Sequence, residues 1–383
     1  MKRRVVILTE IIAPYRTPVF NALAAHPDVD LHVIFLSETD PGLRQWQVYR
    51  DEIRYSYEVL ASHRQRMGSF SVLITRGMRA ALEKSSPQVI VAGGYNYLAM
   101  WQAQRWAGAH GVPFLLWSES NVGDARRNFW WVEAAKRKFI RSCQGYVVPG
   151  SSAAAYLKTF GVAERRIFVA PNAVDVGRFA RAADAARGET GLRKRLGLPE
   201  RYLLFVGRFV QAKGVFDLLE AYAKLPREMR QAVGLVLTGD GPEREQLAER
   251  SRKIESGSVV LTGFLQRDDL PAVYALAEAL VLPTYSDTWG LVVNEAMACG
   301  LPVIVTRAAG CVTDLVGDGE NGYVVGVGDA EGLSAAMSKV WGAPDLRERM
   351  AQRSRARSDR FTPDRWASGM ADAVAGLMGE QRG

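Results

Sequence analysis

The sequence predicts an α/β protein made of two doubly wound domains. Short apolar runs rich in β-branched residues alternate with longer helical stretches along the whole chain. Most of these runs are continuous rather than alternating with polar residues, as in Tyr202–Val206 and Pro302–Val305. Such strands are buried on both faces, which is typical of a parallel sheet covered by helices. The chain has 383 residues, enough for two domains that each bury a full core.

The expected strands are short and follow one another with helical stretches between them. In the first half they are 4–9, 31–36, 88–92, 113–117, 145–149 and 167–170. In the second half they are 202–207, 233–238, 258–261, 279–283 and 302–306. The same strand–helix order in both halves predicts two parallel sheets, each with helices on both faces.

The domain boundaries follow from the stretches that lack a strand pattern. Residues 176–199 show little apolar periodicity, so we expect them to form the interdomain connection between a first domain over 1–175 and a second over 200–361. The last stretch, 362–383, begins with Thr-Pro-Asp, which is typical of a helix start. Two placements are open for this helix: on the outside of the second domain, or crossing back to the first.

Composition limits the classes of protein to consider. The chain is 48% hydrophobic and 23% charged, as in ordinary soluble proteins. No apolar run approaches the length of about 18 residues that a membrane span needs. The apolar run Val5–Leu8 is too short for a signal peptide, so we expect a cytoplasmic protein. The three cysteines are too few and too scattered for a disulfide framework or a zinc site.

The positive charge is confined to the first half. Residues 1–175 carry 22 Lys and Arg against 14 Asp and Glu, whereas residues 176–383 carry 27 of each. A basic half beside a neutral half indicates that the first half meets something anionic. Nucleic acid, an acidic membrane surface or a phosphate-bearing substrate fits this charge.

The segment Leu280–Gly300 has the pattern of a ligand-binding strand–loop–helix unit. A strand ends at Pro283, and after a polar loop a helix begins near Gly290. Such loops lie at the carboxyl edge of a parallel sheet, and a helix N-terminus that begins with glycine favours an anion there. Glu295 lies beyond the first turn, where it either accepts hydrogen bonds from hydroxyls of the same ligand or is simply solvated. A phosphate and a diol this close together describe a nucleotide or a sugar phosphate.

A second segment, Val206–Gly214, places two cations after the first strand of the second domain. Arg208 can hold two phosphate oxygens in a fork, and Lys213 adds a mobile point charge. They are expected on the same side of the sheet as the Asp287–Gly290 loop. The alternative is a surface Arg and a Lys at a helix start. This arrangement is energetically less favourable, because a cation at the N-terminus of a helix opposes the helix dipole.

These residues resemble the donor-binding signature of the retaining glycosyltransferases of family four, whose two Rossmann-like domains face each other across a cleft, the GT-B architecture. That family shows an acidic residue, seven others, Glu, and then Ala-Met-Ala-Cys-Gly-x-Pro-Val, which here occupies Asp287–Val303. Its Gly-Arg-x4-Lys-Gly stands at Gly207–Gly214, its Pro-Asn-Gly-Val-Asp at Pro171–Asp175 and its Gly-Asp-Gly-Pro at Gly239–Pro242. The resemblance covers the second half closely and the first half loosely.

The resemblance implies three catalytic residues. Arg208 and Lys213 would hold the donor diphosphate and stabilise it as a leaving group, and Asp287 would contact the transferred sugar. The chemistry of the reaction supports these roles. Transfer from a nucleotide sugar requires that the negative charge of the departing diphosphate be stabilised, either by a metal or by cations and a helix N-terminus. The sequence supplies cations and a helix end but no metal-ligand cluster, so no metal and no cofactor is expected.

The resemblance also implies the donor-binding residues. Glu295 would hold the ribose hydroxyls of a UDP- or GDP-sugar, and backbone groups at Gly207, Gly290 and Leu291 would lie along the phosphates. Two departures from the family pattern stand out: Asp287 replaces the usual Glu, and Ala173 replaces the usual Gly. The shorter Asp287 side chain is expected to alter which sugar hydroxyl is contacted.

The first domain departs more. The usual Gly-Gly pair after the first strand is absent, and the loop there ends in Pro14-Tyr15-Arg16. We hypothesise that Arg16 meets an acceptor or donor phosphate in place of the glycines; a surface turn is the alternative. Many relatives have a His after the strand 113–117, where this chain has Glu119, a second acceptor-side candidate or a structural residue.

Residues 126–141 combine basic and aromatic side chains, among them Trp130 and Trp131. A basic helix with interfacial aromatics can lie on an anionic membrane, which would make the protein peripheral on the inner face. A helix with a packed apolar stripe and a solvated basic face is the alternative. Nucleic acid is not expected as a partner, because no binding module is present.

The function expected from all this is a retaining, metal-independent glycosyltransferase of the hexosyltransferase class. It would move a sugar from a nucleotide-diphosphate sugar to an acceptor hydroxyl, on a lipid-linked or oligosaccharide acceptor, in polysaccharide or glycolipid biosynthesis. Two alternatives stay open: a nucleotide-sugar epimerase of similar shape, and a non-catalytic protein that binds sugar nucleotides.

Overall fold

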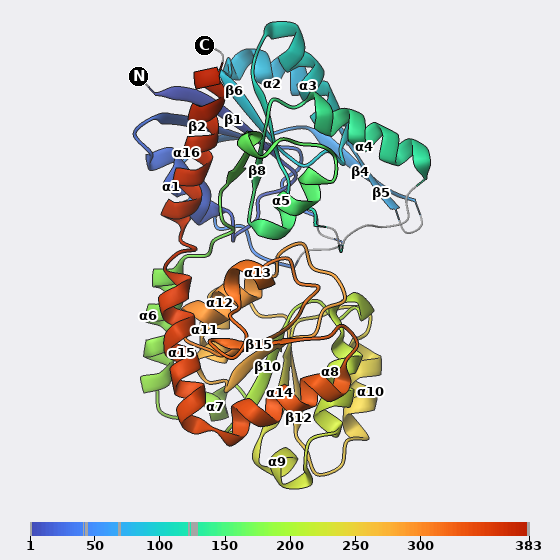
Figure 1. Ribbon diagram of the computed structural model, residues 1–383, viewed down its shortest axis with the longest axis vertical. Helices are drawn as coiled ribbons and strands as arrows, with labels where there is room; N and C mark the ends of the chain where they lie inside the picture. Colours follow the sequence, from blue (N-terminus) through green and yellow to red (C-terminus); the bar gives the residue numbers. More distant parts are fainter. Residues whose placement is uncertain are drawn as a thin grey trace. The chain divides into compact units, whose positions relative to one another are not determined.

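The computed structural model describes residues 2–40, 42, 45–67, 70–121, 123 and 129–380. The chain divides into two compact units (Figure 1). The first unit contains the residues up to Asn172 together with the C-terminal helix from Pro363, and the second contains Ala173–Thr362.

The first unit is built on a parallel sheet with the strand order β3-β2-β1-β6-β7-β8-β9. Its strands are β1 (Arg3–Thr9), β2 (Val29–Phe35), β3 (Ser56–Val59), β6 (Val89–Gly93), β7 (Phe114–Trp117), β8 (Gly145–Val148) and β9 (Ile167–Val169). Its helices are α1 (Thr17–Ala25), α2 (Met78–Ser85), α3 (Leu98–His110), α4 (Trp130–Ser142), α5 (Ser151–Lys158) and α16 (Pro363–Glu380). An antiparallel hairpin is formed by β4 (Ser62–Met67) and β5 (Phe70–Thr75).

The second unit has a parallel sheet of order β12-β11-β10-β13-β14-β15. Its strands are β10 (Tyr202–Val206), β11 (Gly234–Thr238), β12 (Val259–Gly263), β13 (Ala279–Leu282), β14 (Val303–Thr306) and β15 (Gly322–Val325). Its longer helices are α6 (Val176–Gly188), α8 (Val215–Ala223), α10 (Arg244–Arg252), α12 (Leu291–Ala298), α14 (Ala330–Gly342) and α15 (Pro344–Ser358). Its shorter helices are α7 (Leu192–Arg195), α9 (Arg227–Ala232), α11 (Leu270–Ala275) and α13 (Val312–Leu315).

The predicted fold class is confirmed. All the strands expected from continuous apolar runs are present, and the central ones are buried on both faces: Val5–Leu8 in β1 and all of β10. The expected strands did not include β3, β4, β5 or the edge strand β15. For β3 (SYEV) and β4 (SHRQRM) the sequence explains the failure, because both are polar and lack the apolar run of a buried strand.

The stretch 176–199 is not a bare connection, contrary to the sequence-based prediction. It forms α6 and α7 within the second unit. The carboxylate of Asp175 caps α6 by accepting a hydrogen bond from the Arg178 N–H at 2.9 Å, so this part of the Pro-Asn-Ala-Val-Asp motif starts a helix. The buried stripe of α6 is Phe179, Ala183 and Ala186. A stripe with two small alanines gives a weak apolar signal, which is why the helix was missed.

The C-terminal helix α16 lies on the first unit, where it packs against α1, β8 and β9 (Figure 1). Trp366 is buried against the rings of Phe20 and Trp117, with centroids 5.7 Å and 5.3 Å away. A Cβ at Gly369 would lie 2.2 Å from the carbonyl oxygen of Val169, so the helix reaches this close only because the residue is glycine.

Candidate functional site

The topology of the second sheet places two loops side by side. β10 lies between β11 and β13, so the chain turns to one side after β10 and later returns on the other. Ligands of doubly wound proteins bind at such a switch point, outside the carboxyl ends of the strands. The loops that leave these ends are 207–214 after β10 and 283–290 after β13, the two segments singled out from the sequence.

The two loops are joined by backbone contacts. Gly214 has φ +67°, and a Cβ there would lie 1.9 Å from the carbonyl oxygen of Pro283. The carbonyl oxygen of Ala212 accepts hydrogen bonds from the Tyr285 N–H at 2.9 Å and from the Thr284 hydroxyl at 3.0 Å. The glycine of the Gly-Arg-x4-Lys-Gly motif is therefore required by a close approach, and the two loops form one unit.

The Gly-Asp-Gly-Pro turn after β11 supports the loop that carries Arg208. A Cβ at Gly239, where φ is +141°, would lie 1.9 Å from the carbonyl oxygen of Gly207. The Phe209 N–H donates to the Asp240 carbonyl oxygen at 2.9 Å. Arg208 is exposed, and none of the described residues forms an ion pair with it. Its guanidinium is thus held at the carboxyl edge by a fixed backbone and can bind a ligand.

Lys213 and Asp287 are brought together by the joined loops. Lys213 Nζ donates to Asp287 Oδ2, and the two side chains are 24% and 16% exposed. The other carboxylate oxygen of Asp287 accepts from the Trp289 N–H at 3.3 Å, and its carbonyl oxygen accepts from the Gly310 N–H at 3.0 Å. These contacts fix the Asp287 carboxylate beside the Lys213 ammonium group, at the carboxyl ends of β10 and β13.

The helix α12 begins at this site. Its N-cap is Gly290, which has φ +99° and offers no side chain to the free N–H groups of the first turn. A Cβ at Gly290 would lie 3.2 Å from the Leu282 side chain and 3.5 Å from Cys311 Sγ. No acidic residue lies in the first turn, which starts at Leu291. The positive end of the α12 dipole therefore lies next to Lys213 and Asp287, and no side chain of α12 itself compensates it.

Glu295 lies in the middle of α12 and is partly buried, so the alternative of a fully solvated side chain is wrong. Its Oε2 accepts a hydrogen bond of 2.7 Å from the hydroxyl of Tyr274, a fully buried residue on α11. Burial raises the pKa of Glu295 to about 7, although the Tyr274 hydrogen bond opposes this shift. Burial and the neighbouring carboxylate raise the pKa of Tyr274 as well. Tyr274 could not be identified from the sequence, because a tyrosine in an apolar helix has the pattern of a core residue.

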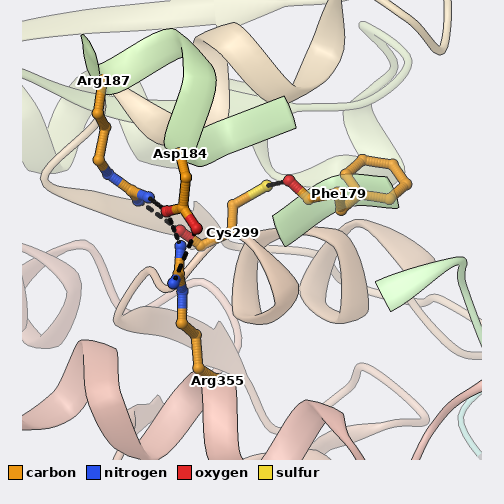
Figure 2. A network of polar contacts seen from close by, with 5 residues as sticks. All are labelled: Phe179, Asp184, Arg187, Cys299 and Arg355. Atoms are coloured by element: carbon orange, nitrogen blue, oxygen red, sulfur yellow. Dashed lines mark hydrogen bonds and ion pairs between the residues drawn. The ribbon is translucent and has the colours of Figure 1, made fainter. Parts of the chain in front are cut away.

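A network of polar contacts fixes the other end of α12 (Figure 2). Arg187 on α6 donates to the carbonyl oxygen of Cys299, which follows the last turn of α12, and also contacts Asp184 at 3.0 Å. Asp184 is in turn paired with Arg355 on α15, and the thiol of Cys299 points to the carbonyl oxygen of Phe179. Cations at a helix C-terminus satisfy its free carbonyls and its dipole. The network therefore helps to hold α12, and with it the N-terminus beside Lys213 and Asp287, in place.

The first unit has its own switch point, because β1 lies between β2 and β6. The two acceptor-side candidates meet there: Arg16 Nη2 lies 3.2 Å from Glu119 Oε2, and the guanidinium lies over the Trp117 ring, 4.1 Å from its centroid. Burial opposes the charge of Arg16, but Glu119 and Tyr15 outweigh it and raise the pKa of Arg16 above its ordinary value. The cation predicted to meet a phosphate is thus already paired with a carboxylate.

A second cluster at this edge was missed by sequence reasoning. Arg64 on β4 contacts Glu10 at 2.8 Å and Asp40 at 3.2 Å, and Tyr97 is hydrogen-bonded to Glu10. Glu10 follows β1, Asp40 follows β2 and Tyr97 follows β6. The cluster was missed because it depends on β4, a polar strand that the sequence pattern did not indicate.

The segment 126–141 is described from Phe129 onward; Arg126 and Arg127 lie outside the described residues. Helix α4 buries only Phe139 and Ile140. Its N-terminal end exposes three aromatic side chains: Phe129 is 72% exposed, Trp130 81% and Trp131 57%. The packed apolar stripe of the alternative is thus present only at the C-terminal end of the helix.

The described residues contain no group of three or more His, Cys, Asp or Glu side chains arranged to hold a metal ion. Within the same residues, no helix is both long enough and apolar enough to span a bilayer.

Comparison with known proteins gives the family. Residues 190–357 match the family described as Glycosyl transferases group 1, and residues 21–178 match the one described as Glycosyltransferase Family 4. The chain belongs to these glycosyltransferases. The match confirms the resemblance seen in the motifs, because it covers both units and includes the segments that carry Lys213 and Glu295.

Named relatives of this glycosyltransferase chain include a D-inositol 3-phosphate glycosyltransferase of Salinispora arenicola. It is 34% identical over 220 residues, which are 54% of this chain and 49% of the relative. A glycogen synthase of Mycobacterium tuberculosis is 30% identical over 282 residues, which are 73% of this chain and 65% of the relative. The chain thus spans about half of the first of these relatives and about two thirds of the second.

Solved glycosyltransferase structures share the fold over the whole chain. The Anabaena protein HepE in complex with UDP and glucose has a TM-score of 0.75 and 17% identity, and the alignment covers 97% of this chain and 99% of HepE. This likeness confirms the GT-B fold class of two Rossmann-like domains.

Proposed function

We propose that this glycosyltransferase transfers a hexose from a UDP- or GDP-sugar to an acceptor hydroxyl, with retention of anomeric configuration and without a metal ion. One observation carries the proposal: the joined loops bring Arg208, Lys213 and the N-terminus of α12 to a single switch point. Three positive elements around one edge suit the two negative charges of the donor diphosphate and the third that develops when it leaves.

The diphosphate is the group that Lys213 and the α12 N-terminus bind in this account. An ammonium group has three donors, so Lys213 can keep Asp287 and still donate to a phosphate oxygen. Arg208 closes on the diphosphate in a fork, and the N–H groups behind Gly290 take a second oxygen. These contacts grow stronger as the bond to the sugar breaks and negative charge builds on the diphosphate, which is the condition for catalysis.

Glu295 and Asp287 orient the remainder of the donor. With its pKa near 7, Glu295 is readily ionised when ribose hydroxyls donate to it, and Tyr274 holds the carboxylate in position. Asp287, held beside Lys213, would accept hydrogen bonds from the sugar hydroxyls. UDP is the first nucleotide to try, because the structurally similar HepE was solved in complex with UDP.

The reaction is tested by incubating the protein with UDP-glucose, UDP-galactose or GDP-mannose and a panel of saccharides in the presence of a chelator. Free nucleotide is expected to be released. The anomeric proton signals in NMR are expected to show that the transferred sugar keeps the α-configuration of the donor. Lys213→Ala and Arg208→Ala should each lower the rate by about a hundredfold or more. Lys224→Ala, an exposed lysine paired with Glu331 in the same unit, is the matched control and should leave the rate unchanged.

Other outcomes reject the proposal in distinguishable ways. Isomerisation of the donor without nucleotide release identifies an epimerase. Nucleotide binding without any turnover identifies a non-catalytic binding protein. Activity that the chelator abolishes contradicts the metal-free account.

We further propose that the acceptor is lipid-linked or an oligosaccharide, and that the protein works at the cytoplasmic face of an anionic membrane through α4. Helix α4 contains one acidic residue, Glu133, and four cations: Lys136, Arg137, Lys138 and Arg141. The exposed aromatic end, Phe129–Trp131, precedes this basic stretch. Aromatic rings at one end and cations behind them are the chemistry of an interfacial helix.

The expected membrane affinity follows from these groups. Burial of Trp130 and Trp131 in the interface contributes about 2 kcal/mol each. Each exposed cation near an anionic surface contributes about 1 kcal/mol. Arg137, Lys138 and Arg141 are all exposed, so electrostatic and apolar contributions are of similar size.

Vesicle sedimentation tests the membrane proposal. The wild type should sediment with vesicles containing phosphatidylglycerol and much less with pure phosphatidylcholine. The double variant Trp130→Ala, Trp131→Ala should lose at least tenfold in partitioning. Phe264→Ala, which removes a 38% exposed aromatic ring from the second unit, is the control and should change nothing. Equal binding of the double variant and the wild type would contradict the role of α4.

A further inference from the structure

A groove of about 870 Å³ lies in the first unit between α2 and α3, two helices that pack side by side (Figure 1). This α2–α3 groove is lined by the end of β5, by residues at the start of α2 and by the C-terminal part of α3. Its lining includes neither the Arg16–Glu119 pair nor any residue of α4. A groove of this volume can hold a small organic ligand.

Three guanidinium groups line the α2–α3 groove together with one carboxylate. Arg76 follows β5, Arg79 lies in the first turn of α2, and Arg105 lies on α3. Arg79 Nε lies 2.7 Å from Oε1 of Glu83, the one acid of this lining. Arg76 and Arg105 are exposed, and neither forms an ion pair with a described residue. The described residues of the lining therefore leave two guanidinium charges for an anionic ligand.

The first turn of α2 adds backbone donors to the same groove. The N-cap of this helix is Gly77, which has φ +88° and provides no side-chain acceptor for the free N–H groups of the turn. No acidic residue lies in that turn. Residues 77–80 all line the groove, so the positive end of the α2 dipole lies beside the guanidinium groups.

Trp106 provides an aromatic wall. Its ring is stacked on His110, with the two centroids 4.1 Å apart, and both residues line the groove. The indole N–H is buried, and no described residue accepts a hydrogen bond from it. An aromatic wall beside a group of cations suits a ligand that joins an organic part to an anionic group.

We propose that the α2–α3 groove binds a phosphomonoester, with its phosphate held by Arg76, Arg105 and the first turn of α2, and its organic part against Trp106. A phosphomonoester carries about two negative charges near neutral pH, which matches the two guanidinium groups left without an ion pair. Its oxygens accept hydrogen bonds from guanidinium and backbone N–H groups at once. The proposal goes beyond the proposed function and does not depend on it.

The groove can be probed by ¹⁹F NMR on the full chain labelled with 5-fluorotryptophan. The Trp106 signal is assigned with Trp106→Phe. Glucose 6-phosphate is expected to shift this signal saturably, and added salt should weaken the binding. Glucose at the same concentrations should leave the signal in place, because it lacks the charge. Absence of a shift with glucose 6-phosphate, or an equal shift with glucose, would overturn the proposal.

Two matched variants locate the binding. The double variant Arg76→Gln, Arg105→Gln should bind glucose 6-phosphate roughly tenfold or more weakly than the wild type. Lys84→Gln is the control, because Lys84 is an exposed cation in the last turn of α2 that does not line the groove. It should leave the affinity unchanged. Equal affinities of the double variant and the wild type would overturn the proposal.

A third variant gives a test of opposite sign. Glu83→Gln removes the one carboxylate of the lining and releases Arg79 from its ion pair. Glucose 6-phosphate should then bind roughly two- to fivefold more tightly. An unchanged or weaker affinity in the folded variant, as judged by circular dichroism, would contradict the role of charge in the groove.

The same phosphate chemistry is presented by a lipid headgroup, so a soluble lipid phosphate is compared with the sugar phosphate. If dihexanoyl phosphatidate shifts the Trp106 signal at concentrations about tenfold lower than glucose 6-phosphate does, the groove binds a lipid phosphate; otherwise the ligand is a soluble ester. UDP titration of the same samples reports on the second unit. Failure of UDP to bind the wild type would count against the proposed function, while a glucose 6-phosphate shift at Trp106 would still stand.

Discussion

Replacing Glu295 by Gln is expected to stabilise the protein at alkaline pH while weakening nucleotide binding. The carboxyl group has a pKa of about 7 in the folded chain against 4.5 for an ordinary glutamate, because burial disfavours its charge. The folded state therefore holds a proton that the unfolded state has lost between pH 4.5 and 7, so stability falls as the pH rises through this window. Glu295→Gln removes this loss and keeps an acceptor for the Tyr274 hydroxyl.

The magnitude follows from the shift. A difference of about 2.5 pKa units corresponds to up to about 3 kcal/mol, fully expressed above pH 7 and absent below pH 4.5. Urea unfolding at pH 4.5 and pH 8 measures this effect. The variant should match the wild type at the lower pH and exceed it at pH 8. Glu220→Gln, on the exposed side of α8, is the control and should show no pH-dependent difference. A variant less stable than the wild type at pH 8, or an equal difference at both pH values, refutes the reasoning.

Three further perturbations test the packing around the two units. Gly214→Ala would place a Cβ 1.9 Å from the Pro283 carbonyl oxygen, so we expect about 2–4 kcal/mol lower unfolding free energy in urea. Arg355→Ala breaks the exposed ion pair with Asp184, and the Arg355 guanidinium lowers the pKa of that carboxyl group. We expect the unfolding free energy measured in urea to fall by about 0.5–1 kcal/mol. This difference should vanish in acid, because Asp184 is then protonated. Gly369→Ala would place a Cβ 2.2 Å from a carbonyl oxygen of β9, so calorimetry should show unfolding several degrees lower.

The fold, and the meeting of the 207–214 and 283–290 loops at one sheet edge, could be predicted because they depend on local patterns. Continuous apolar runs such as Tyr202–Val206 mark buried parallel strands, and the glycines of the motifs mark close backbone approaches. Gly214 and Gly239 prove to be required by contacts under 2 Å from an added Cβ. The order of the motifs along the chain was enough to predict that Lys213 and Asp287 lie at the same edge of the sheet.

The rest depends on contacts between residues far apart in the sequence. Tyr274 supports Glu295 from a different helix, and Arg64 reaches Glu10 from a polar hairpin strand; neither leaves a periodic signal. Helix α6 was mistaken for a connection because its buried stripe contains alanines. The exposure of Trp130 is likewise a property of where α4 begins, and composition could not distinguish it from a packed residue.

The central claim is a metal-free nucleotide site at the β10–β13 switch point, and calorimetric titration with UDP and GDP in chelator tests it most directly. One of the two nucleotides is expected to bind the wild type. Affinity should fall roughly tenfold or more in Lys213→Ala and in Glu295→Ala, and should stay the same in Lys224→Ala. Binding that requires a divalent metal, or that survives both substitutions at the switch point, would contradict the account.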